Sequence, residues 1–481
     1  MRRRVLFAAA GGHGHLQPLL PLVTEAAGAG HEVLVTGAAS LGRHVTARGL
    51  AFIASGPDLL PIHAPLVVHD IDTERQAVAD HFVARLGRSR ATAVLNLCML
   101  WHSDVVVRDE LDFGAAVAAE AAALPHVAVI VIVIGAGSFI IPAVIDAPLK
   151  NLSSEVLGHD GAGSAFLHRH LTLTPFPASF RDPSDPLPGR ALVYTVPPTP
   201  RTRKGNDGAS VFVTVGTIFN TESGDLLRIA ALGATNCAAV RHVVVATGDH
   251  LDPGGLGPLP SHVAVHRFVD QDAVLARCDA VVSHAGSGTV LGALKHSLPT
   301  VNLPMGADQQ LNADRLRALG LGLSLSADSA DMEQISDALT DVLASVGAAR
   351  RLQAVRDEIL ASADPGRRHE GRHCSRAMTR PHLTGPLERS LGDRQLNYRP
   401  VPGADDAPRW SPLRWAWSGC VGVSPVAAAN PQETWRPRGT RRGRRHRSRG
   451  NEKPLLGFAP VTYASSRSVS AATCASSSAI R

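Results

Sequence analysis

The chain has 481 residues, enough for two or three domains, and 44% of them are hydrophobic, which suffices for large cores. The formal net charge of +6 is unevenly distributed: from Arg367 onward there are 21 Lys and Arg against 7 Asp and Glu, so the preceding residues are mildly acidic. Before Arg367 the cysteines are Cys98, Cys237 and Cys278, and their spacing disfavours both a disulfide framework and a structural zinc site.

Two apolar stretches could be mistaken for membrane or secretion signals. Residues 5–10 follow three arginines, but the run is too short for a secretory signal and glycines follow it at once. Residues 127–145 are uncharged, yet they are rich in β-branched residues and contain Gly135, Gly137 and Pro142. This composition favours a buried strand and a loop over a transmembrane helix. We therefore expect no transmembrane segment and a cytoplasmic location.

The first part of the chain alternates between predicted strands and helices. Strands are predicted at 5–9, 32–36, 51–54, 104–107 and 127–134, and helices near 18–29, 73–98 and 113–123. Such alternation predicts a parallel, doubly wound sheet. Residues 165–200 are rich in proline and irregular, as in a connection that leaves a domain. We predict a first Rossmann-like domain over 1–196 and a linker over 197–207.

The same pattern restarts after the linker. Strands are predicted at 210–215, 242–246, 263–266, 280–283 and 300–303, and helices at 225–232, 271–277, 332–343 and 348–360. This predicts a second Rossmann-like domain over 208–365. The periodic pattern then stops, and residues 439–450 form a dense arginine run. We expect a basic, disordered tail over 366–481 and no nucleic-acid partner, although an arginine run also suits nucleic acid or a membrane surface.

Residues 284–309, HAGSGTVLGALKHSLPTVNLPMGADQ, follow a buried strand. The small residues after His284 let the backbone approach a phosphate, and the free N–H groups of the helix start point at it. The next strand, 300–303, leads to Asp308 and Gln309. Polar groups after two successive strands predict a diphosphate site beside a site for a hydroxylated group. The alternative is an ordinary crossover with a capping Ser or Thr.

This stretch resembles the donor-binding motif of nucleotide-sugar-dependent glycosyltransferases of the GT-B fold, in particular the bacterial enzymes that glycosylate antibiotics and other natural products. The resemblance extends from residue 4 to about residue 365. It implies two facing Rossmann-like domains with parallel sheets and a UDP- or TDP-sugar as donor. It further implies that the donor diphosphate is bound at His284, Gly286, Ser287, Gly288 and Thr289, and that the sugar hydroxyls are bound by Asp308 and Gln309.

Three more donor residues are candidates through the same resemblance. Thr217 ends a segment similar to the family's VTxGT, although it could also be an ordinary turn residue. Phe268 and Gln271 lie in a segment similar to the one that binds the nucleobase, in which Asp270 replaces the usual proline. No Asp-x-Asp metal motif stands beside the donor site. We therefore expect no metal and no cofactor, with backbone N–H groups, the helix dipole and His284 meeting the diphosphate.

His15 and Asp109 are the candidate catalytic pair. His15 lies in the first strand–helix loop, and Asp109 is placed directly after the strand at 105–107. In a Rossmann sheet the first and fourth strands are neighbours, so these loops should adjoin. An imidazole oriented by a carboxylate can take a proton from an acceptor hydroxyl. The family resemblance implies the same roles. His13 is a rival base, and Glu110 and Asp112 are interpreted as solvated turn carboxylates.

These features predict an inverting glycosyltransferase that acts on a small hydrophobic acceptor. Two alternatives stay open: another GT-B enzyme, such as a nucleotide-sugar epimerase or a lipid-linked sugar transferase, and a non-catalytic glycosyltransferase-like partner. The histidine–aspartate pair favours the first reading, because an epimerase needs no acceptor base of this form. The acceptor pocket is expected from loops within residues 55–100 and 135–170.

Overall fold

The computed structural model describes residues 2–58, 66–132, 139–158, 161, 163–202, 208–217, 219–248 and 250–363. The predicted tail and residues 203–207 of the predicted linker lie outside these ranges. The prediction of a disordered tail therefore stays a prediction. Within the described ranges, no helix combines the length and the apolar character needed to cross a membrane.

The first sheet is entirely parallel, and its described strands follow the order β3-β2-β1-β4-β5-β6-β7. The first and fourth strands are neighbours, as predicted, with Phe7 of β1 opposite Val107 of β4. The strands are β1 Arg4–Ala8, β2 Glu32–Gly37, β3 Phe52–Ala54, β4 Val105–Asp109, β5 His126–Val129, β6 Leu171–Thr174 and β7 Ala191–Val193.

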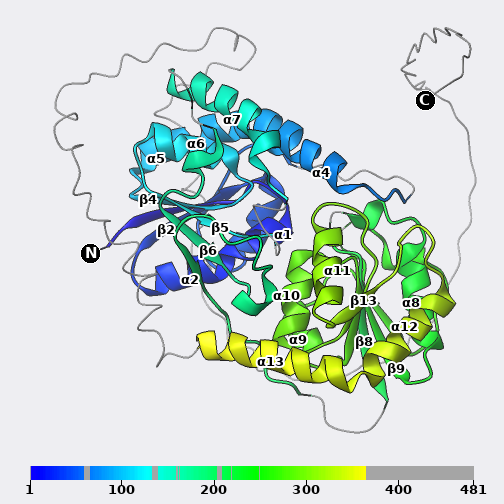
Figure 1. The fold of residues 1–481 in the computed structure, drawn as a ribbon. Helices are drawn as coiled ribbons and strands as arrows, with labels where there is room; N and C mark the ends of the chain where they lie inside the picture. Colours follow the sequence, from blue (N-terminus) through cyan, green and yellow to red (C-terminus); the bar gives the residue numbers. More distant parts are fainter. Residues whose placement is uncertain are drawn as a thin grey trace, which may run out of the picture. The chain divides into compact units, whose positions relative to one another are not determined.

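Helices cover both faces of this sheet (Figure 1). Successive strand residues point to opposite faces: Phe7 packs with Leu19 and Val23 of α2, and Leu6 packs with Val94 of α5 and its neighbours from α6. The helices are α1 His13–Leu16, α2 Leu19–Gly28, α3 Gly42–Thr46, α4 Ile71–Ala77, a π-helical segment Val78–Leu86, α5 Gly87–Trp101, α6 Phe113–Ala121 and α7 Pro142–Leu157.

The second sheet is also parallel, with the order β10-β9-β8-β11-β12-β13. Val211 and Val213 pack on one face with α8 and α12, and Phe212 packs on the other with α9 and α10. The strands are β8 Ala209–Thr214, β9 Val240–Ala246, β10 Val263–His266, β11 Ala280–Ser283, β12 Thr300–Asn302 and β13 Gly322–Ser324. The helices are α8 Leu226–Asn236, α9 Gln271–Leu275, α10 Ser287–Lys295, α11 Gln309–Ala318, α12 Met332–Ala344 and α13 Val346–Ala363.

The structure adds elements where the sequence pattern indicated irregular chain. Helix α7 contains Pro148 in its interior, which ordinarily costs about 3 kcal/mol. Ile145, Leu149 and Leu152 of α7 are nevertheless buried in one apolar cluster, so packing overrides the local signal. Strands β6 and β7 form within the proline-rich region because β5 supplies a neighbouring strand for pairing.

Candidate active site

His15 lies in the short helix α1, and its position depends on two neighbours. A Cβ atom at Gly11 would lie 2.2 Å from His15 Cδ2, so only glycine at that position leaves room for the ring. On another side the ring stacks on Phe82, with centroids 5.6 Å apart and planes inclined by 18°. Phe82 belongs to the π-helical segment Val78–Leu86, a rare conformation that often occurs at functional sites. The sequence analysis did not identify Phe82.

Asp109 is the last residue of β4 and is fully buried. Its Oδ1 lies 3.3 Å from His15 Nδ1 and also accepts the N–H of Leu111 at 2.8 Å. Its Oδ2 accepts the N–H of Ala10 at 2.6 Å. Two backbone donors therefore fix the carboxylate, which faces Nδ1 and leaves Nε2 as the nitrogen that can take a proton.

Each member of this pair shifts the pKa of the other so that the charged form of both groups is favoured. Burial by itself lowers the pKa of His15, but the charge of Asp109 and the hydrogen bond to it prevail, so the pKa is raised above its ordinary value. Burial raises the pKa of Asp109, but His15 and the backbone donors lower it by more, so the net pKa is lowered. The pair thus combines a carboxylate with an imidazole of increased basicity.

The residues after the predicted strand at 104–107 are less exposed than expected: the turn covers only residues 110–111, and the carboxylates of this segment are not solvated. Strand β4 continues through Arg108 and Asp109, both fully buried. Glu110, expected to be solvated, is 1% exposed, and its Oε1 accepts the N–H groups of Val131 and Ile132 at 2.8 and 2.7 Å. Burial raises the pKa of Glu110 to about 7. The Glu110 carboxyl group is tolerated in the interior because backbone N–H groups that follow β5 donate to its Oε1.

Asp112 was also expected to be solvated, and that expectation is wrong as well. It is 1% exposed and forms a buried ion pair with Arg90 of α5. Its Oδ1 also accepts the N–H of Ala115 at 2.9 Å and so caps α6. Arg90 in addition donates to the backbone oxygen of Ser55 at 3.0 Å. Asp112 therefore joins three segments of the first domain.

The rival base, His13, has a different environment. It begins α1 and is partly exposed. Its Nε2 lies 3.3 Å from Nε2 of Gln17, which is exposed. His15 in contrast faces the buried carboxylate of Asp109. The geometry favours His15 over His13 as the residue able to accept a proton.

In the second domain, the loops after the first and fourth strands adjoin. Thr214 of β8 pairs with Ser283 of β11, which places Gly216 next to the ring of His284. A Cβ atom at Gly216 or Gly286 would lie 2.5 or 2.2 Å from His284 Nε2, so the ring needs both glycines. Burial lowers the pKa of His284 to about 4. The imidazole is therefore neutral near pH 7 and can offer an N–H to an anion but no positive charge.

The predicted diphosphate residues form the start of α10. Gly286 is the N-cap, and Ser287, Gly288 and Thr289 make the first helical turn. The free N–H groups and the positive end of the helix dipole at such a turn favour an anion. Thr217 lies in the loop after β8 and is partly buried.

An alanine in the left-handed backbone region occurs in each of the two predicted donor-binding loops, after β11 and after β12. Ala285 has φ +63° and Ala307 has φ +51°. A non-glycine residue in this region costs about 1–3 kcal/mol, and such strain concentrates at functional sites. The Ala285 backbone is held by its neighbours: its N–H donates to Ser283 Oγ at 3.2 Å, and its carbonyl accepts the Asn312 amide at 2.9 Å.

Asp308 belongs to a buried network that joins the two loops. Ser287 Oγ donates to Asp308 Oδ2 at 2.5 Å, and Asn312 Nδ2 donates to the same oxygen at 2.8 Å. Asn312 is fully buried and lies one helical turn after Asp308 in α11. The sequence analysis missed Asn312, and its spacing of four residues from Asp308 is the signal that could have identified it.

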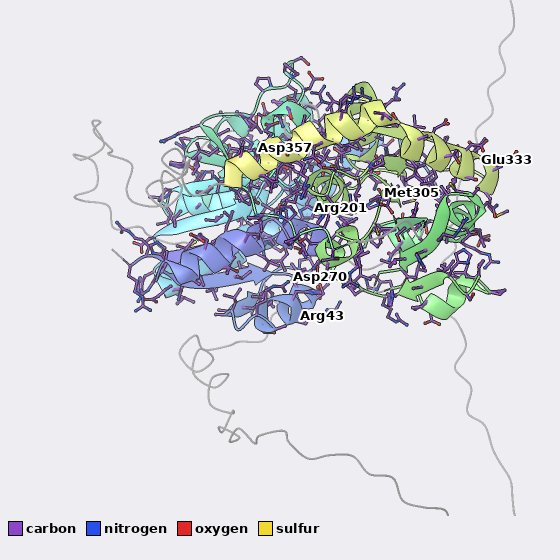
Figure 2. All side chains as sticks on the ribbon, turned by 90° about the horizontal axis from the view of Figure 1, so that it is seen from below. Arg43, Arg201, Asp270, Met305, Glu333 and Asp357 are labelled. Carbon is purple, nitrogen blue, oxygen red and sulfur yellow. The ribbon has the colours of Figure 1, made fainter. Side chains whose placement is uncertain are left out.

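Gln309, the other predicted sugar ligand, is 2% exposed. Its Oε1 accepts the N–H groups of Met305 and Gly306 at 2.8 and 3.3 Å, and Met305 is labelled in Figure 2. The carbonyl oxygen therefore holds the loop that leads to Asp308. Within the described residues, the amide nitrogen of Gln309 has no hydrogen-bond acceptor.

The candidate base-binding residues lie near the start of α9. Phe268 is 41% exposed, and Gln271 Nε2 donates to the carbonyl of Gly288 at 3.3 Å. Asp270, labelled in Figure 2, caps α9 by accepting the N–H of Ala273 at 3.2 Å. The aspartate in the position of the family's proline thus has a structural role.

Comparison with known proteins identifies the family. The family described as "Erythromycin biosynthesis protein CIII-like, C-terminal domain" matches residues 232–368. The L-demethylnoviosyl transferase of Streptomyces niveus is 30% identical over 353 residues, which are 70% of this chain and 88% of the relative. The chain belongs to the antibiotic glycosyltransferase family.

Other members resemble this glycosyltransferase over most of their length. The 3-alpha-mycarosylerythronolide B desosaminyl transferase of Saccharopolyspora erythraea is 26% identical over 417 residues, which are 75% of this chain and 96% of the relative. Among solved structures, the spinosyn rhamnosyltransferase SpnG complexed with thymidine diphosphate is 25% identical, with a TM-score of 0.63 over 78% of this chain and 100% of that chain. The calicheamicin glycosyltransferase CalG4 has a TM-score of 0.62 and 24% identity over 79% of this chain and 100% of that chain. The fold of this glycosyltransferase is GT-B, as predicted.

Proposed function

We propose that this glycosyltransferase inverts the sugar's configuration as it moves the sugar from a TDP- or UDP-sugar to a hydroxyl group of a small hydrophobic natural product. The observation that carries the proposal is the contact between His15 and the buried carboxylate of Asp109 at the carboxyl edge of the first sheet. A TDP-sugar is the preferred donor. The TDP-daunosamine transferase of Streptomyces peucetius is 27% identical over 413 residues, and SpnG was solved with thymidine diphosphate.

In this mechanism His15 acts as general base. Its Nε2 takes the proton of the acceptor hydroxyl while the hydroxyl oxygen attacks the anomeric carbon of the sugar. The bond from that carbon to the diphosphate oxygen breaks, and the nucleoside diphosphate leaves with the electron pair. Attack from the side opposite the leaving group inverts the anomeric configuration. Asp109 holds the imidazole through Nδ1 and stabilises its protonated form, and a base of this kind contributes about 10²–10⁴-fold.

The donor is assigned to the second domain, proposed to span residues 208–365, and the acceptor to the first, proposed to span 1–196. The diphosphate binds the start of α10 at Gly286, Ser287, Gly288 and Thr289, with His284 and Thr217 beside it. Asp308 and Gln309 bind the sugar hydroxyls. Phe268 stacks on the nucleobase, for which its exposed ring is suited, and Gln271 hydrogen-bonds to it.

The transfer is proposed to need neither metal nor cofactor. The start of α10 offers backbone N–H groups and a helix dipole, which stabilise the departing diphosphate without a cation. A panel of nucleotide sugars, first screened by thermal shift and then incubated with hydrophobic polyhydroxylated acceptors, tests the proposal. A new glycoside together with free nucleoside diphosphate is the expected product. Epimerised nucleotide sugar without acceptor would indicate an epimerase, and donor binding without turnover on any acceptor would indicate a binding partner.

A further inference from the structure

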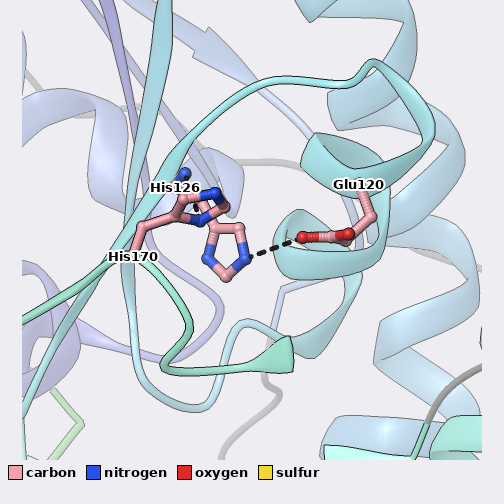
Figure 3. A group of neighbouring side chains, drawn as sticks. All are labelled: Glu120, His126 and His170. Carbon is pink, nitrogen blue, oxygen red and sulfur yellow. Dashed lines mark hydrogen bonds and ion pairs between the residues drawn. The ribbon is translucent and has the colours of Figure 1, made fainter. Parts of the chain in front are cut away.

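A cluster of metal-binding side chains lies at the amino edge of the first sheet, opposite the edge that carries Asp109. It consists of Glu120 near the end of α6, His126 at the start of β5, and His170 directly before β6 (Figure 3). One potential ligand atom from each residue lies within 4.8 Å of the other two. The proposed transferase mechanism uses none of these residues.

The parallel strand register brings the two histidines together. Val127 of β5 is opposite Leu171 of β6, so His126 and His170 occupy the preceding positions on neighbouring strands. Their ring centroids are 5.1 Å apart. His170 Nδ1 accepts the backbone N–H of His126 at 3.4 Å. Glu120 enters from the helix that precedes β5, and its Oε1 lies 3.3 Å from His126 Nε2 (Figure 3).

The ring of His126 is buried without the partners that a buried imidazole requires. Its side chain is fully buried, and within the described residues Nδ1 has no hydrogen-bond partner. Among the same residues, Nε2 has only the long contact of 3.3 Å with Glu120 Oε1. A buried polar atom without a partner costs about 1–3 kcal/mol. A metal ion bound between Nε2 and Glu120 Oε1 would replace this long contact by two short coordinate bonds.

We propose that Glu120, His126 and His170 bind one divalent transition-metal ion, with zinc as the best fit. Two imidazoles and a carboxylate suit zinc, whose bonds to such ligands are about 2.0–2.2 Å long. In a tetrahedral site of that size, ligand atoms are about 3.3–3.6 Å apart, which agrees with the 3.3 Å between His126 Nε2 and Glu120 Oε1. His170 is only partly buried and can close the remaining distance. A water molecule completes the coordination.

A neighbouring arginine orients the carboxylate ligand. Arg169 forms an ion pair with Glu120 through Oε2, leaving Oε1 directed at His126. This is the arrangement of an outer-shell partner that orients a ligating carboxylate.

The metal joins a helix to two strands of the first sheet. Glu120 and His126 are close in sequence, but His170 comes from a distant segment. Binding therefore stabilises the folded first domain, in which alone the three ligands meet. Because the site lies at the edge opposite Asp109, it does not take part in sugar transfer, and its test is independent of the proposed function.

Zinc binding to the full chain, measured by equilibrium dialysis against a zinc buffer with metal analysis, tests the site. The chain contains 22 histidines, so the informative quantity is the difference between variants. Wild type should retain one equivalent more than His170→Gln or Glu120→Gln. Two controls should match wild type at saturating zinc: His262→Gln, which removes an exposed histidine, and Arg169→Gln, which breaks the ion pair with Glu120 but removes no ligand.

Thermal unfolding supplies the second readout. Zinc should raise the unfolding temperature of wild type and His262→Gln, and this increase should be absent in His170→Gln. Cobalt added in place of zinc should give a visible absorption band in wild type that His170→Gln lacks. The site is overturned if wild type and His170→Gln bind the same number of zinc equivalents and show the same temperature shift. His170 is partly exposed, so this variant is the one best able to fold without the metal.

Discussion

Replacing Asp109 by asparagine tests two roles of this carboxylate: it accepts two backbone N–H groups, and it orients and charges His15. The change keeps the size of the side chain but removes its charge and replaces one oxygen by an N–H donor. In the wild type, Oδ2 accepts from Ala10 at 2.6 Å, and Oδ1 accepts from Leu111 at 2.8 Å while facing His15. Asparagine has a single oxygen for these groups. We therefore expect losses in both stability and activity.

The stability loss follows from counting donors. The two backbone N–H groups approach different oxygens, so in Asp109→Asn one of them faces an amide NH₂ in a fully buried position. Leaving a buried N–H without an acceptor costs about 1–3 kcal/mol. The folded-state pKa of Asp109 is lowered, so its ionisation stabilises the protein above the ordinary aspartate pKa, and this contribution is lost as the pH falls through the lowered value. The stability difference between wild type and variant should therefore be largest near neutral pH and shrink in acid.

The activity loss should depend on pH in a defined direction. The neutral imidazole of His15 is the active base, so wild-type turnover should fall as the pH drops through the raised pKa of His15. Without the charge of Asp109 this pKa is lower, and the fall should move to lower pH. The plateau rate should also decrease, because the ring loses the partner at Nδ1 that orients it.

The assays are urea unfolding and the pH dependence of kcat, with Glu110→Gln as matched control. Glu110 is buried one residue later, and its Oε1 alone accepts two backbone N–H groups, so glutamine can keep both bonds. The control should shift the pH profile less than Asp109→Asn and retain most turnover. An Asp109→Asn enzyme with an unchanged pH profile and wild-type kcat would refute the catalytic pair.

Other outcomes follow from the same site. His15→Ala should lower kcat by about 10²–10⁴-fold while its donor affinity stays within a few-fold of wild type. His13→Ala should lower kcat less. If His13→Ala instead had the larger effect, His13 rather than His15 would be the base. Asp308→Ala should weaken binding of the nucleotide sugar by about 1.5–3 kcal/mol but hardly affect binding of the free nucleoside diphosphate. Equal losses of affinity for both ligands, measured by calorimetry, would contradict sugar binding by Asp308. Asn312→Ala removes the hydrogen bonds to Ala285 and Asp308 and should also weaken binding of the nucleotide sugar. An unchanged affinity would argue against a positioning role of Asn312. EDTA should leave turnover intact at temperatures well below unfolding, and a loss restored by magnesium would show that transfer requires a metal.

Patterns along the chain were sufficient to predict the fold and the positions of its main loops. Alternating strands and helices predicted two parallel sheets, and the general Rossmann order placed the first strand beside the fourth. The contact between His15 and Asp109 therefore follows from topology, because the carboxyl ends of neighbouring parallel strands lie together. The adjoining position of Gly216 and His284 follows for the same reason.

Burial of the charges at residues 110 and 112 could not be predicted in this way. A run of charged residues between apolar segments usually lies in solvent, and only the tertiary structure supplies the N–H groups of Val131 and Ile132 for Glu110 and the guanidinium of Arg90 for Asp112. Whether a charge can be buried depends on partners from other segments, and no local pattern encodes them.

The sequence by itself therefore determined the two parallel sheets, the donor motif and the likeness to antibiotic glycosyltransferases, since these depend on periodicity and on residues adjacent in the chain. The tertiary structure decided which side chains support the candidate site: Phe82 against His15, and Asn312 between the two predicted donor-binding loops. It also brought Glu120, His126 and His170 together through the register of β5 and β6. Contacts of this kind depend on the packing and register of segments distant in the chain, which one sequence read along its length does not contain.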